Sequence, residues 1–329
     1  MYPPKEMIWI TWENHRRTKE LSNALGAPLF TLLYDGSYVA KVLVVSLKTV
    51  AVLLHIRPRR VIAQNPSMVL SALLCFLKPF LGYKVIVDRH SNFKFETQDS
   101  PKLRYRVFHY LSRYTVRKAD LTIVTNEFLK GIVQKWGGRG FVLQDRLPEL
   151  PFRQSKPPRL AGRHNITYIC SFSDDEPVDE VLDAARSLDK SIVMHVTGNP
   201  RDYLSRVKDG VPENVVFTGF LPERDYQSLL GASDAIIALT RDEHLLLCGA
   251  YEAVSLGKPL ILSDTGCVRE YFRDGPIYTR NNGEDLAQAI RSAIGNRRAL
   301  LLKSQQLRKR LQVEWTSRFR DLTAVLWRA

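Results

Sequence analysis

The sequence predicts an α/β chain of two similar domains, each with a parallel sheet covered by helices on both faces. Apolar runs that suit buried strands alternate with helical patterns along the chain, and this alternation is typical of parallel sheets. The alternation stops once, in the glycine- and proline-rich stretch 137–158, and then starts again. With 329 residues the chain is long for one domain and has room for two.

We assign the first domain to residues 1–150. Its expected strands are short aliphatic runs, and its expected helices have apolar residues at helical spacing. The strands are expected at 7–11, 29–34, 61–64, 84–88 and 121–125, and the helices at 16–25, 38–57, 67–81, 102–118 and 127–136.

We assign the second domain to residues 151–329, with the boundary within the proline-rich stretch 146–163. Strands are expected at 166–172, 192–197, 215–218, 235–239, 260–263 and 277–279, and helices at 177–188, 201–208, 223–231, 248–257, 267–273, 284–295 and 297–327. We expect the last, basic helix to pack back against the first domain. Two such domains facing each other would leave a cleft between their strand ends, where ligands bind.

The net charge of +14 is concentrated in the first domain. Residues 1–150 hold 23 Lys and Arg against 11 Asp and Glu, whereas the rest of the chain holds 25 against 23. This asymmetry favours an anionic partner for the first domain. Nucleic acid is not expected, because no nucleic-acid-binding motif accompanies the charge.

The four cysteines are scattered without metal-ligand spacing, which is typical of reduced thiols. The N-terminus MYPPKEMIWI does not resemble a secretory signal, so we expect a cytoplasmic protein. The most apolar stretch, 39–56, contains Lys41 and Lys48, and we therefore do not expect it to span a membrane. Basic, apolar helices at 38–57 and 67–81 instead favour peripheral attachment to an anionic membrane surface, here the inner face of the cytoplasmic membrane. The alternative is that these helices only cover the sheet.

Two segments after strands of the first domain carry candidate functional residues. Asn14, Arg16 and Arg17 follow the first strand, and arginines at a helix start oppose the helix dipole, which favours a ligand-binding role over helix stabilisation. Asp88 and His90 lie at the end of the fourth strand and are candidate catalytic residues. Surface salt bridges and a structural histidine are the alternatives.

The stretch 235–264 is the centre of the second domain. An apolar strand is followed by the polar turn 240–244, a small-residue helix start and another strand. A helix start at the end of a strand binds anions, because its first amides point outward and the helix dipole is positive there. The alternative is an ordinary βαβ packing unit.

Several short motifs of the second domain, in order and spacing, resemble glycosyltransferases of the GT-B fold. These are Phe217 to Leu221, Ala232 to Ala235, Tyr251 to Ala253, Leu256 to Pro259 and Ser263-Asp264. The pattern is most similar to the retaining family 4 group, which uses nucleotide-sugar donors. Segments 12–17 and 174–178 resemble bacterial members that act in surface-polysaccharide assembly.

The resemblance implies two facing Rossmann-like domains and roles for named residues. Glu252 matches the second acid of the E-x7-E motif, which binds the donor ribose, and His90 matches a strand-end histidine near the donor sugar. The first domain would bind the acceptor, through the loop that contains Arg16. The remaining implied donor-binding residues are Gly198, Asn199, Phe220 and Leu221 beside the base and Cys248, Gly249 and Ala250 at the diphosphate.

The sequence departs from the family pattern at two places. His244 stands where the first acid of the motif is expected, so either His244 makes the donor contact or Glu243 substitutes for it. The family tends to carry an Arg and a Lys after the first strand of the second domain, but the segment 171–179 is acidic. Phosphate charge would then be met by Arg241, Lys258 or Arg201.

The resulting hypothesis is sugar transfer from a nucleotide-sugar to a lipid-linked or saccharide acceptor in cell-surface polysaccharide biosynthesis. The resemblance to the retaining group implies retention of stereochemistry. We expect no metal and no cofactor, because the amides at 248–250 and nearby cations would stabilise the leaving phosphate. Asp174-Asp175 and Asp242-Glu243 are interpreted as a helix cap and a turn. The alternatives are a non-catalytic GT-B partner subunit that binds nucleotide-sugar and a nucleotide-sugar epimerase.

Overall fold

The computed structural model describes residues 5–64, 67–150, 160, 162–207 and 210–328. The chain forms two compact units, Met1–Arg146 with Trp315–Ala329 and Leu147–Glu314. These differ from the predicted ranges 1–150 and 151–329 mainly because the end of the last helix packs with the first sheet. The predicted boundary within 146–163 lies largely outside the described residues.

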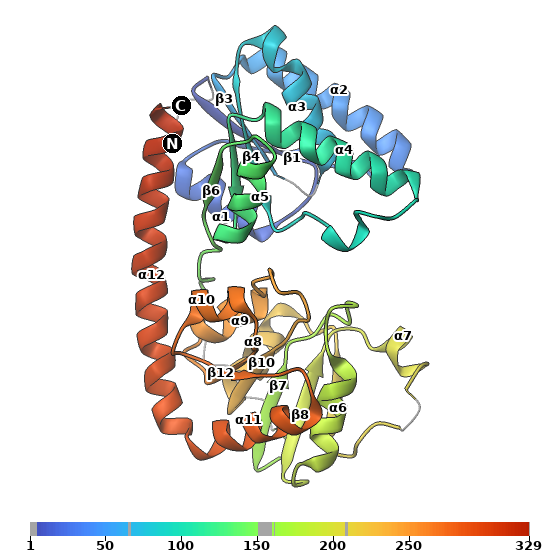
Figure 1. Ribbon diagram of the computed structural model, residues 1–329, viewed down its shortest axis with the longest axis vertical. Coiled ribbons are helices and arrows are strands. Elements are labelled where there is room, and N and C mark those ends of the chain that lie inside the picture. The colour runs from blue at the N-terminus through green and yellow to red at the C-terminus, as the bar shows by residue number, and fades with distance from the viewer. Residues whose placement is uncertain (1–4, 65–66, 151–159, 161, 208–209, 329) are drawn as a thin grey trace. The chain divides into compact units, whose positions relative to one another are not determined.

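The first unit is built on a parallel six-stranded sheet in the order β2-β1-β3-β4-β5-β6 (Figure 1). Its strands are β1 (Met7–Thr11), β2 (Leu29–Thr31), β3 (Arg60–Gln64), β4 (Lys84–His90), β5 (Leu121–Val124) and β6 (Gly140–Val142). Its helices are α1 (Arg16–Leu25), α2 (Tyr38–Ile56), α3 (Met68–Leu81), the short 3-10 helix η1 (Phe95–Thr97), α4 (Leu103–Lys118) and α5 (Glu127–Lys135). The sequence analysis missed β6, because the glycine-rich run 137–140, which overlaps its first residue, indicated a linker.

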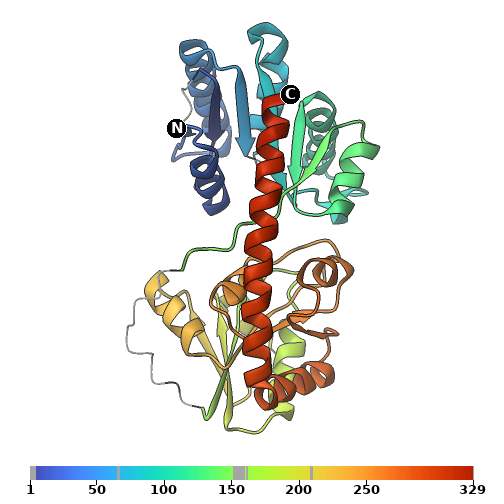
Figure 2. The same cartoon turned by 90° about the vertical axis from the view of Figure 1, so that its left-hand side faces the viewer.

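Helices cover both faces of the first sheet. On one face, α2, α3 and α4 pack through residues such as Val45 and Leu74 against Ile8 and Val85. On the other face, α1 and the end of α12 (Arg297–Arg328) pack against Trp9 and Ile62, as Figure 2 shows for the last helix. The aliphatic strands are buried from both sides, which explains why they contain continuous apolar runs.

Helix α2 is attached to the sheet along one narrow side only. Val45, Thr49 and Leu53 recur every four residues and are buried, and the indole Nε1 of Trp12 donates a hydrogen bond to Thr49 Oγ1 at 3.0 Å. Only 17% of its most apolar 18-residue window is buried.

Helix α2 is also the one helix in the described part of the chain that is long and apolar enough to cross a membrane by length and composition. Its mean hydropathy is 2.0 over that window. Length and composition alone do not decide whether α2 spans a membrane, so the expectation from Lys41 and Lys48 that it does not stays a prediction.

The second unit repeats the architecture with the strand order β12-β11-β10-β7-β8-β9, again parallel. Its strands are β7 (His164–Tyr168), β8 (Ile192–Thr197), β9 (Val215–Gly219), β10 (Ala235–Ala238), β11 (Leu260–Ser263) and β12 (Ile277–Thr279). Its helices are α6 (Val178–Ser187), α7 (Arg201–Leu204), α8 (Glu223–Ala232), α9 (Cys248–Ser255), α10 (Gly266–Phe272), α11 (Gly283–Gly295) and the first part of α12. Helices α6 and α11 pack on one face of the sheet, and α8, α9, α10 and α12 pack on the other.

The predicted α/β class and the two parallel sheets are confirmed. The predicted facing of the two domains across a cleft stays a prediction.

Candidate functional site

In each sheet there is one topological switch point, where successive strands stop being added on one side of the first strand and are added on the other. In the first unit this switch point lies between β1 and β3, and in the second it lies between β7 and β10. Ligands of open α/β sheets bind outside the carboxyl ends of the strands at such points. The loops after β1, β3, β7 and β10 are therefore the first places to inspect.

A buried ion-pair network stands behind the strand ends of the first unit. The Arg17 guanidinium donates from Nε to Asp88 Oδ2 at 3.0 Å, from Nη1 to Asp145 Oδ1 at 2.6 Å and from Nη2 to the Leu143 carbonyl at 3.0 Å. The side chains of Arg17 and Asp88 are 4% and 1% exposed. Burial opposes the charge on Arg17, but the two carboxylates raise its pKa above the usual value. Arg17 and Asp88 thus join α1 to β4 inside the unit.

His90 lies at the open end of this network. Its Nε2 is 3.1 Å from Asp145 Oδ2, and its Nδ1 is 3.3 Å from Ser91 Oγ. The backbone at His90 has a φ of 57°, in the left-handed region, which is uncommon for a residue other than glycine and recurs at functional sites. A carboxylate on one ring nitrogen fixes which nitrogen carries the proton. Asp145 therefore orients His90.

The electrostatics of this network favour a charged Asp145. Burial raises the pKa of the Asp145 carboxyl, but His90 and Arg17 outweigh burial and hold that pKa below its usual range. His15 lies with its ring centroid 6.5 Å from that of His90. Burial and the neighbouring His90 lower the pKa of His15. Sequence reasoning missed Asp145, because it follows the strand that the sequence analysis did not predict.

The three predicted acceptor-binding residues occupy different environments. Asn14 is exposed, and Arg16 is partly exposed, with its Nε 3.7 Å from Glu20 Oε1. Arg17 is buried and its guanidinium is bound by Asp88 and Asp145. The unfavourable interaction of Arg17 with the helix dipole is compensated by these two carboxylates. Arg17 therefore does not present its charge to a ligand at the surface.

In the acidic loop after β7, a glutamate of the loop accepts hydrogen bonds from the loop's own backbone amides. The Glu176 carboxylate accepts hydrogen bonds from the backbone amides of Ser171 and Ser173, both at 2.9 Å to Oε2, and from the Ser171 hydroxyl at 3.1 Å. Phe172, between these amides, has a φ of 62°. Amides arranged in this way form an anion-binding nest. Here the Glu176 carboxylate of the same loop occupies the nest.

The cations expected to bind donor phosphates are mostly engaged within the unit. Arg241 Nη2 donates to both oxygens of Glu180 at 2.6 and 2.8 Å. Lys258 Nζ donates to the Ser233 and Gly231 carbonyls at the end of α8, and burial lowers the Lys258 pKa. Of the three predicted cations, Arg201 is the one whose guanidinium makes no hydrogen bond or ion pair with another described residue.

The start of α9 approaches the end of β7 closely. A Cβ at Gly249 would lie 2.9 Å from Cγ2 of Ile169, so a larger residue would push the helix away from the strand. The amide of Ala250 donates to the Leu247 carbonyl at 3.1 Å, whereas Cys248 is exposed at the first position of the helix. Of the three amides at 248–250 that were predicted to bind the diphosphate, the amide of Ala250 is thus already hydrogen-bonded to the backbone.

Glu252 lies one turn further along α9. Its Oε2 accepts a hydrogen bond from the Tyr226 hydroxyl of α8 at 2.5 Å, and its side chain is half-buried. A carboxylate fixed in this way can accept a hydrogen bond from a diol such as a ribose with little loss of entropy. Tyr226 had no signal in the sequence, because its proximity to Glu252 depends on the packing of α8 beside α9.

The turn after β10 contains His244 and Glu243. The His244 amide donates to Asp242 Oδ1 at 2.7 Å, so Asp242 closes the turn as predicted. Glu243 Oε2 accepts from the Gly266 amide at 3.4 Å, at the start of α10.

The Asp174-Asp175 pair does not cap α6, whose N-cap residue is Pro177. Asp175 Oδ2 instead accepts a hydrogen bond from the Thr240 hydroxyl at 2.6 Å and ties the loops after β7 and β10 together.

The predicted base-binding residues lie at the ends of β8 and β9. Gly198 has a φ of 87°, and a Cβ there would lie 2.4 Å from the Cys170 carbonyl oxygen, so only glycine fits. Asn199 Oδ1 accepts from the Arg201 amide at 3.2 Å. Phe220 is 82% exposed, and Leu221 is half-buried. An exposed aromatic ring beside a strand end is a ready stacking surface for a base.

Among the described residues, no three His, Cys, Asp or Glu side chains form a group that could hold a metal ion. The cysteines are free thiols, and Cys248 is the exposed one.

Two comparisons with known proteins bear on this chain. Residues 153–312 match the family model described as glycosyl transferases group 1. Among curated proteins, none matches the chain.

Solved structures resemble the chain over nearly its whole length. Sucrose-phosphate synthase from Thermosynechococcus elongatus is 14% identical, with a TM-score of 0.78 and 98% of both chains covered. HepE from Anabaena in complex with UDP is 13% identical, with a TM-score of 0.75, 98% of this chain and 100% of HepE covered. A UDP-forming α,α-trehalose-phosphate synthase from Burkholderia xenovorans is 13% identical, with a TM-score of 0.64, 89% of this chain and 79% of that one covered. At these identities the similarity shows the fold, two Rossmann-like domains of the GT-B type.

We predict that Asp145→Asn lowers the free energy of unfolding by about 3 kcal/mol at neutral pH, because it removes a charge partner of a buried guanidinium. The Asp145 pKa is lower in the folded protein than in the unfolded chain. The contribution of Asp145 is therefore constant above a pH of about 5 and declines as the pH falls below roughly 4, the ordinary carboxyl pKa.

Urea unfolding between pH 7 and pH 3 measures this difference. Asp99→Asn, at an exposed position, is the control, and it should change stability by less than about 0.5 kcal/mol. A difference between wild type and Asp145→Asn that did not vary with pH would contradict the role of the Asp145 charge.

We predict that Gly198→Ala destabilises the protein by at least about 1–3 kcal/mol, since alanine is strained at this φ and its Cβ meets the Cys170 carbonyl. Gly295→Ala is the matched control, because nothing lies within 4 Å of a Cβ at that helical position. Alanine there should be neutral or stabilising by roughly 0.5–1 kcal/mol. Thermal or urea unfolding measures both, and equal stability of the two variants would count against the geometric role of Gly198.

Proposed function

We propose that the chain, which has the GT-B fold, is a group 1 glycosyltransferase. In this proposal it transfers a sugar from a nucleotide-sugar to a lipid-linked acceptor at an anionic membrane surface. The donor binds to the second unit and the acceptor to the first. A saccharide is the alternative acceptor. Retention of stereochemistry and a role in cell-surface polysaccharide biosynthesis belong to the same proposal, as does a cytoplasmic location on the inner face of the membrane.

The single observation that carries the donor assignment is the position of Glu252. Its carboxylate is held by the Tyr226 hydroxyl at 2.5 Å, one turn into the helix that follows the switch-point strand β10. A nucleotide at this switch point would place its diphosphate near the start of α9 and its ribose near Glu252. HepE has been solved with UDP and with UDP-glucose, which makes a UDP-sugar the first donor to test.

The charge of the leaving diphosphate has few fixed partners in the second unit. Arg241 is paired with Glu180, and the amides of Ser171 and Ser173 are occupied by Glu176. The start of α9 and Arg201 therefore carry the phosphate interaction in this proposal. A donor could recruit Arg241 by replacing the Glu180 carboxylate, since their pair is partly exposed, with the Arg241 side chain 43% accessible, and exposed pairs are weak.

We predict that UDP-glucose raises the melting temperature of the wild-type protein and that Glu252→Ala removes this shift. A ligand that binds only the folded state stabilises it by RT ln(1 + [L]/Kd), which is about 2.7 kcal/mol at one hundred times Kd. Tyr226→Phe should weaken binding by less, roughly fivefold, since it removes one hydrogen bond of about 1 kcal/mol to the carboxylate.

Glu213→Ala is the matched control, because Glu213 is an exposed carboxylate of the same unit that pairs with Lys190 on the surface. It should keep the full shift. A shift retained in Glu252→Ala would contradict the ribose assignment. Binding without turnover on any acceptor would instead favour a non-catalytic subunit that binds nucleotide-sugar.

The membrane part of the proposal rests on outward-facing apolar stripes on neighbouring helices. On α2, Val39, Leu43 and Leu47 recur every four residues and are 68%, 62% and 71% exposed. Helices α3 and α4 add further exposed apolar side chains, and these helices lie next to one another on one face of the sheet (Figure 1). We call the exposed apolar residues of this face the apolar surface: Tyr38, Val39, Leu43, Leu47, Leu54, Phe76, Phe80, Leu103, Val107 and Tyr110.

The positive charge of the same helices favours an anionic membrane as the partner that covers the apolar surface. Helices α2, α3 and α4 contain no acidic residue and eight basic ones: Lys41, Lys48, Lys78, Arg104, Arg106, Arg113, Arg117 and Lys118. Each Lys or Arg close to an anionic membrane contributes about 1 kcal/mol. Apolar side chains that enter the headgroup region add the hydrophobic contribution. The two effects together suffice for reversible attachment.

We predict that the protein co-sediments with vesicles containing anionic phospholipid at low salt and that binding weakens at high salt. The double variant Leu43→Ser/Leu47→Ser should bind at least tenfold more weakly, because each buried leucine is worth about 1.5–3 kcal/mol.

The control for this prediction is Leu302→Ser/Val313→Ser, which changes two exposed apolar residues of α12 (57% and 70% exposed). It should bind vesicles as the wild type does. If the leucine variant kept vesicle binding but lost self-association in solution, the apolar surface would be a protein interface instead.

A further inference from the structure

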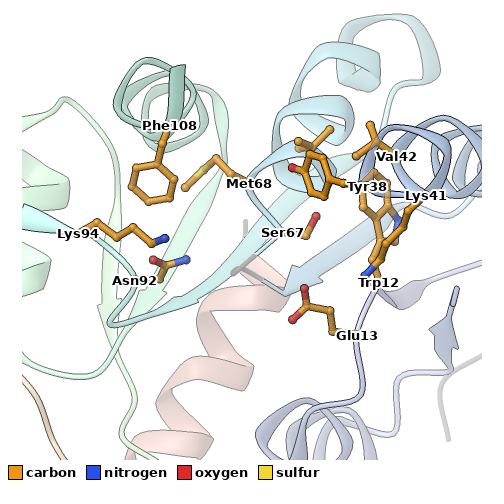
Figure 3. A pocket seen from close by; sticks show the side chains of 11 residues that line it. Trp12, Glu13, Tyr38, Lys41, Val42, Ser67, Met68, Asn92, Lys94 and Phe108 are labelled. Atoms are coloured by element: carbon orange, nitrogen blue, oxygen red, sulfur yellow. The ribbon is translucent and has the colours of Figure 1, made fainter. Parts of the chain in front are cut away.

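A pocket of about 360 Å³ opens at the switch point of the first unit. Trp12 and Glu13, directly after β1, form one part of its wall (Figure 3). Ser67 and Met68, at the start of α3 after β3, form another. The strand order reverses between β1 and β3, which is where an open parallel sheet binds its ligand. None of the predicted acceptor-binding residues lines this pocket.

Two lysines give the pocket a positive charge. Lys41, from the first turns of α2, and Lys94, from the segment after β4, lie on opposite sides of it (Figure 3). Neither has a carboxylate partner among the described residues, and Lys94 Nζ lies 5.2 Å above the Phe108 ring. Two ammonium groups without carboxylate partners on the wall of one pocket favour an anionic group such as a phosphate or diphosphate.

The pocket has one acidic side chain and several hydrogen-bonding groups. Glu13 is exposed, and its carboxylate has no partner in the described part of the chain. Ser67 and Asn92 also line the pocket. A carboxylate, a hydroxyl and an amide together can bind the hydroxyl groups of a sugar, which is the chemistry expected next to the phosphate of an acceptor.

One wall of the pocket continues into the apolar surface defined above. Tyr38 belongs to both, because it lines the pocket and is 72% exposed. Val39 and Leu43 follow on the outer side of α2, and Phe108 lies on α4 next to the exposed Val107. A ligand with a charged head in the pocket would therefore extend a hydrocarbon tail over an apolar surface rather than into water.

From these observations we propose that the pocket binds the head group of a lipid phosphate acceptor. Lys41 and Lys94 bind the phosphate or diphosphate, Glu13 binds hydroxyls of the attached sugar, and the hydrocarbon chain runs along α2. This inference rests on the proposed transferase function and specifies its acceptor as an anionic amphiphile. A saccharide without phosphate would leave both lysines without a partner.

The test uses farnesyl phosphate, a short isoprenoid monophosphate, on the full-length protein without vesicles, so that membrane attachment does not contribute. Equilibrium dialysis should give wild-type binding at least tenfold tighter than that of inorganic phosphate or of farnesol. Lys41→Ala/Lys94→Ala should lose at least tenfold in affinity for farnesyl phosphate. Lys84→Ala, an exposed lysine at the opposite end of β4, should bind as the wild type does.

The outcomes separate this inference from the proposed function. The pocket variant should keep its melting temperature and the UDP-glucose shift, since Lys41 and Lys94 belong to the first unit. Unchanged farnesyl phosphate binding in that variant would overturn the pocket assignment and leave the donor assignment intact. Glucose 1-phosphate binding as tightly as farnesyl phosphate would overturn the lipid part. A wild-type protein that bound farnesyl phosphate but no nucleotide-sugar would contradict the proposed function alone.

Discussion

Parallel pairing of every strand is the constraint on which the rest of this structure depends. Because parallel strands need crossover connections, helices cover both faces of each sheet. Within each sheet, the carboxyl ends of the strands lie along the same edge. At the two switch points, neighbouring loops leave in opposite directions and open a crevice. The pocket beside Trp12 and the loops closed by Glu176 and Asp175 both lie at these points. One architectural rule, applied twice, thus places both candidate sites.

The two units differ in how they manage charge. In the second unit, cations near the strand ends are balanced locally: Arg241 by Glu180, Arg269 by Asp264 and Arg280 by Asp285. In the first unit, the buried cation Arg17 is balanced by Asp88 and Asp145, but the helices on the outer face carry cations without acids. Exposed apolar side chains lower solubility, and positive charge beside them favours attachment to an anionic surface. Helices α2, α3 and α4 therefore carry a large share of the positive charge of the chain.

Much of the candidate site could be anticipated from local pattern, and the part that could not depends on long-range packing. The helix start at 248–250 is a local signal, whereas Glu252 and Gly198 were singled out only through the resemblance to a known family. Asp145 was missed because it reaches His90 from a residue 55 positions away, and Tyr226 because its partner lies on a different helix. Arg17 was correctly singled out as unusual, yet its partners reversed the interpretation from surface contact to buried ion pair. Lys41 and Lys94 gave no motif at all, since only the fold brings α2 and the segment after β4 around one pocket.

The sequence alone determined the α/β class, the alternation of strands and helices apart from β6, and the asymmetry of charge, because each of these depends on composition and on periodicities of two and 3.6 residues. It also indicated the helix start at 248–250, which belongs to one continuous segment, and the resemblance of that segment to a known family added Glu252. Tertiary structure decided which charges are paired and which face solvent. It buried Arg17, closed the acidic loop on Glu176 and left α2 with most of its apolar surface exposed. Those outcomes depend on contacts between residues far apart in the chain, and no local pattern encodes which partner a charged side chain will meet.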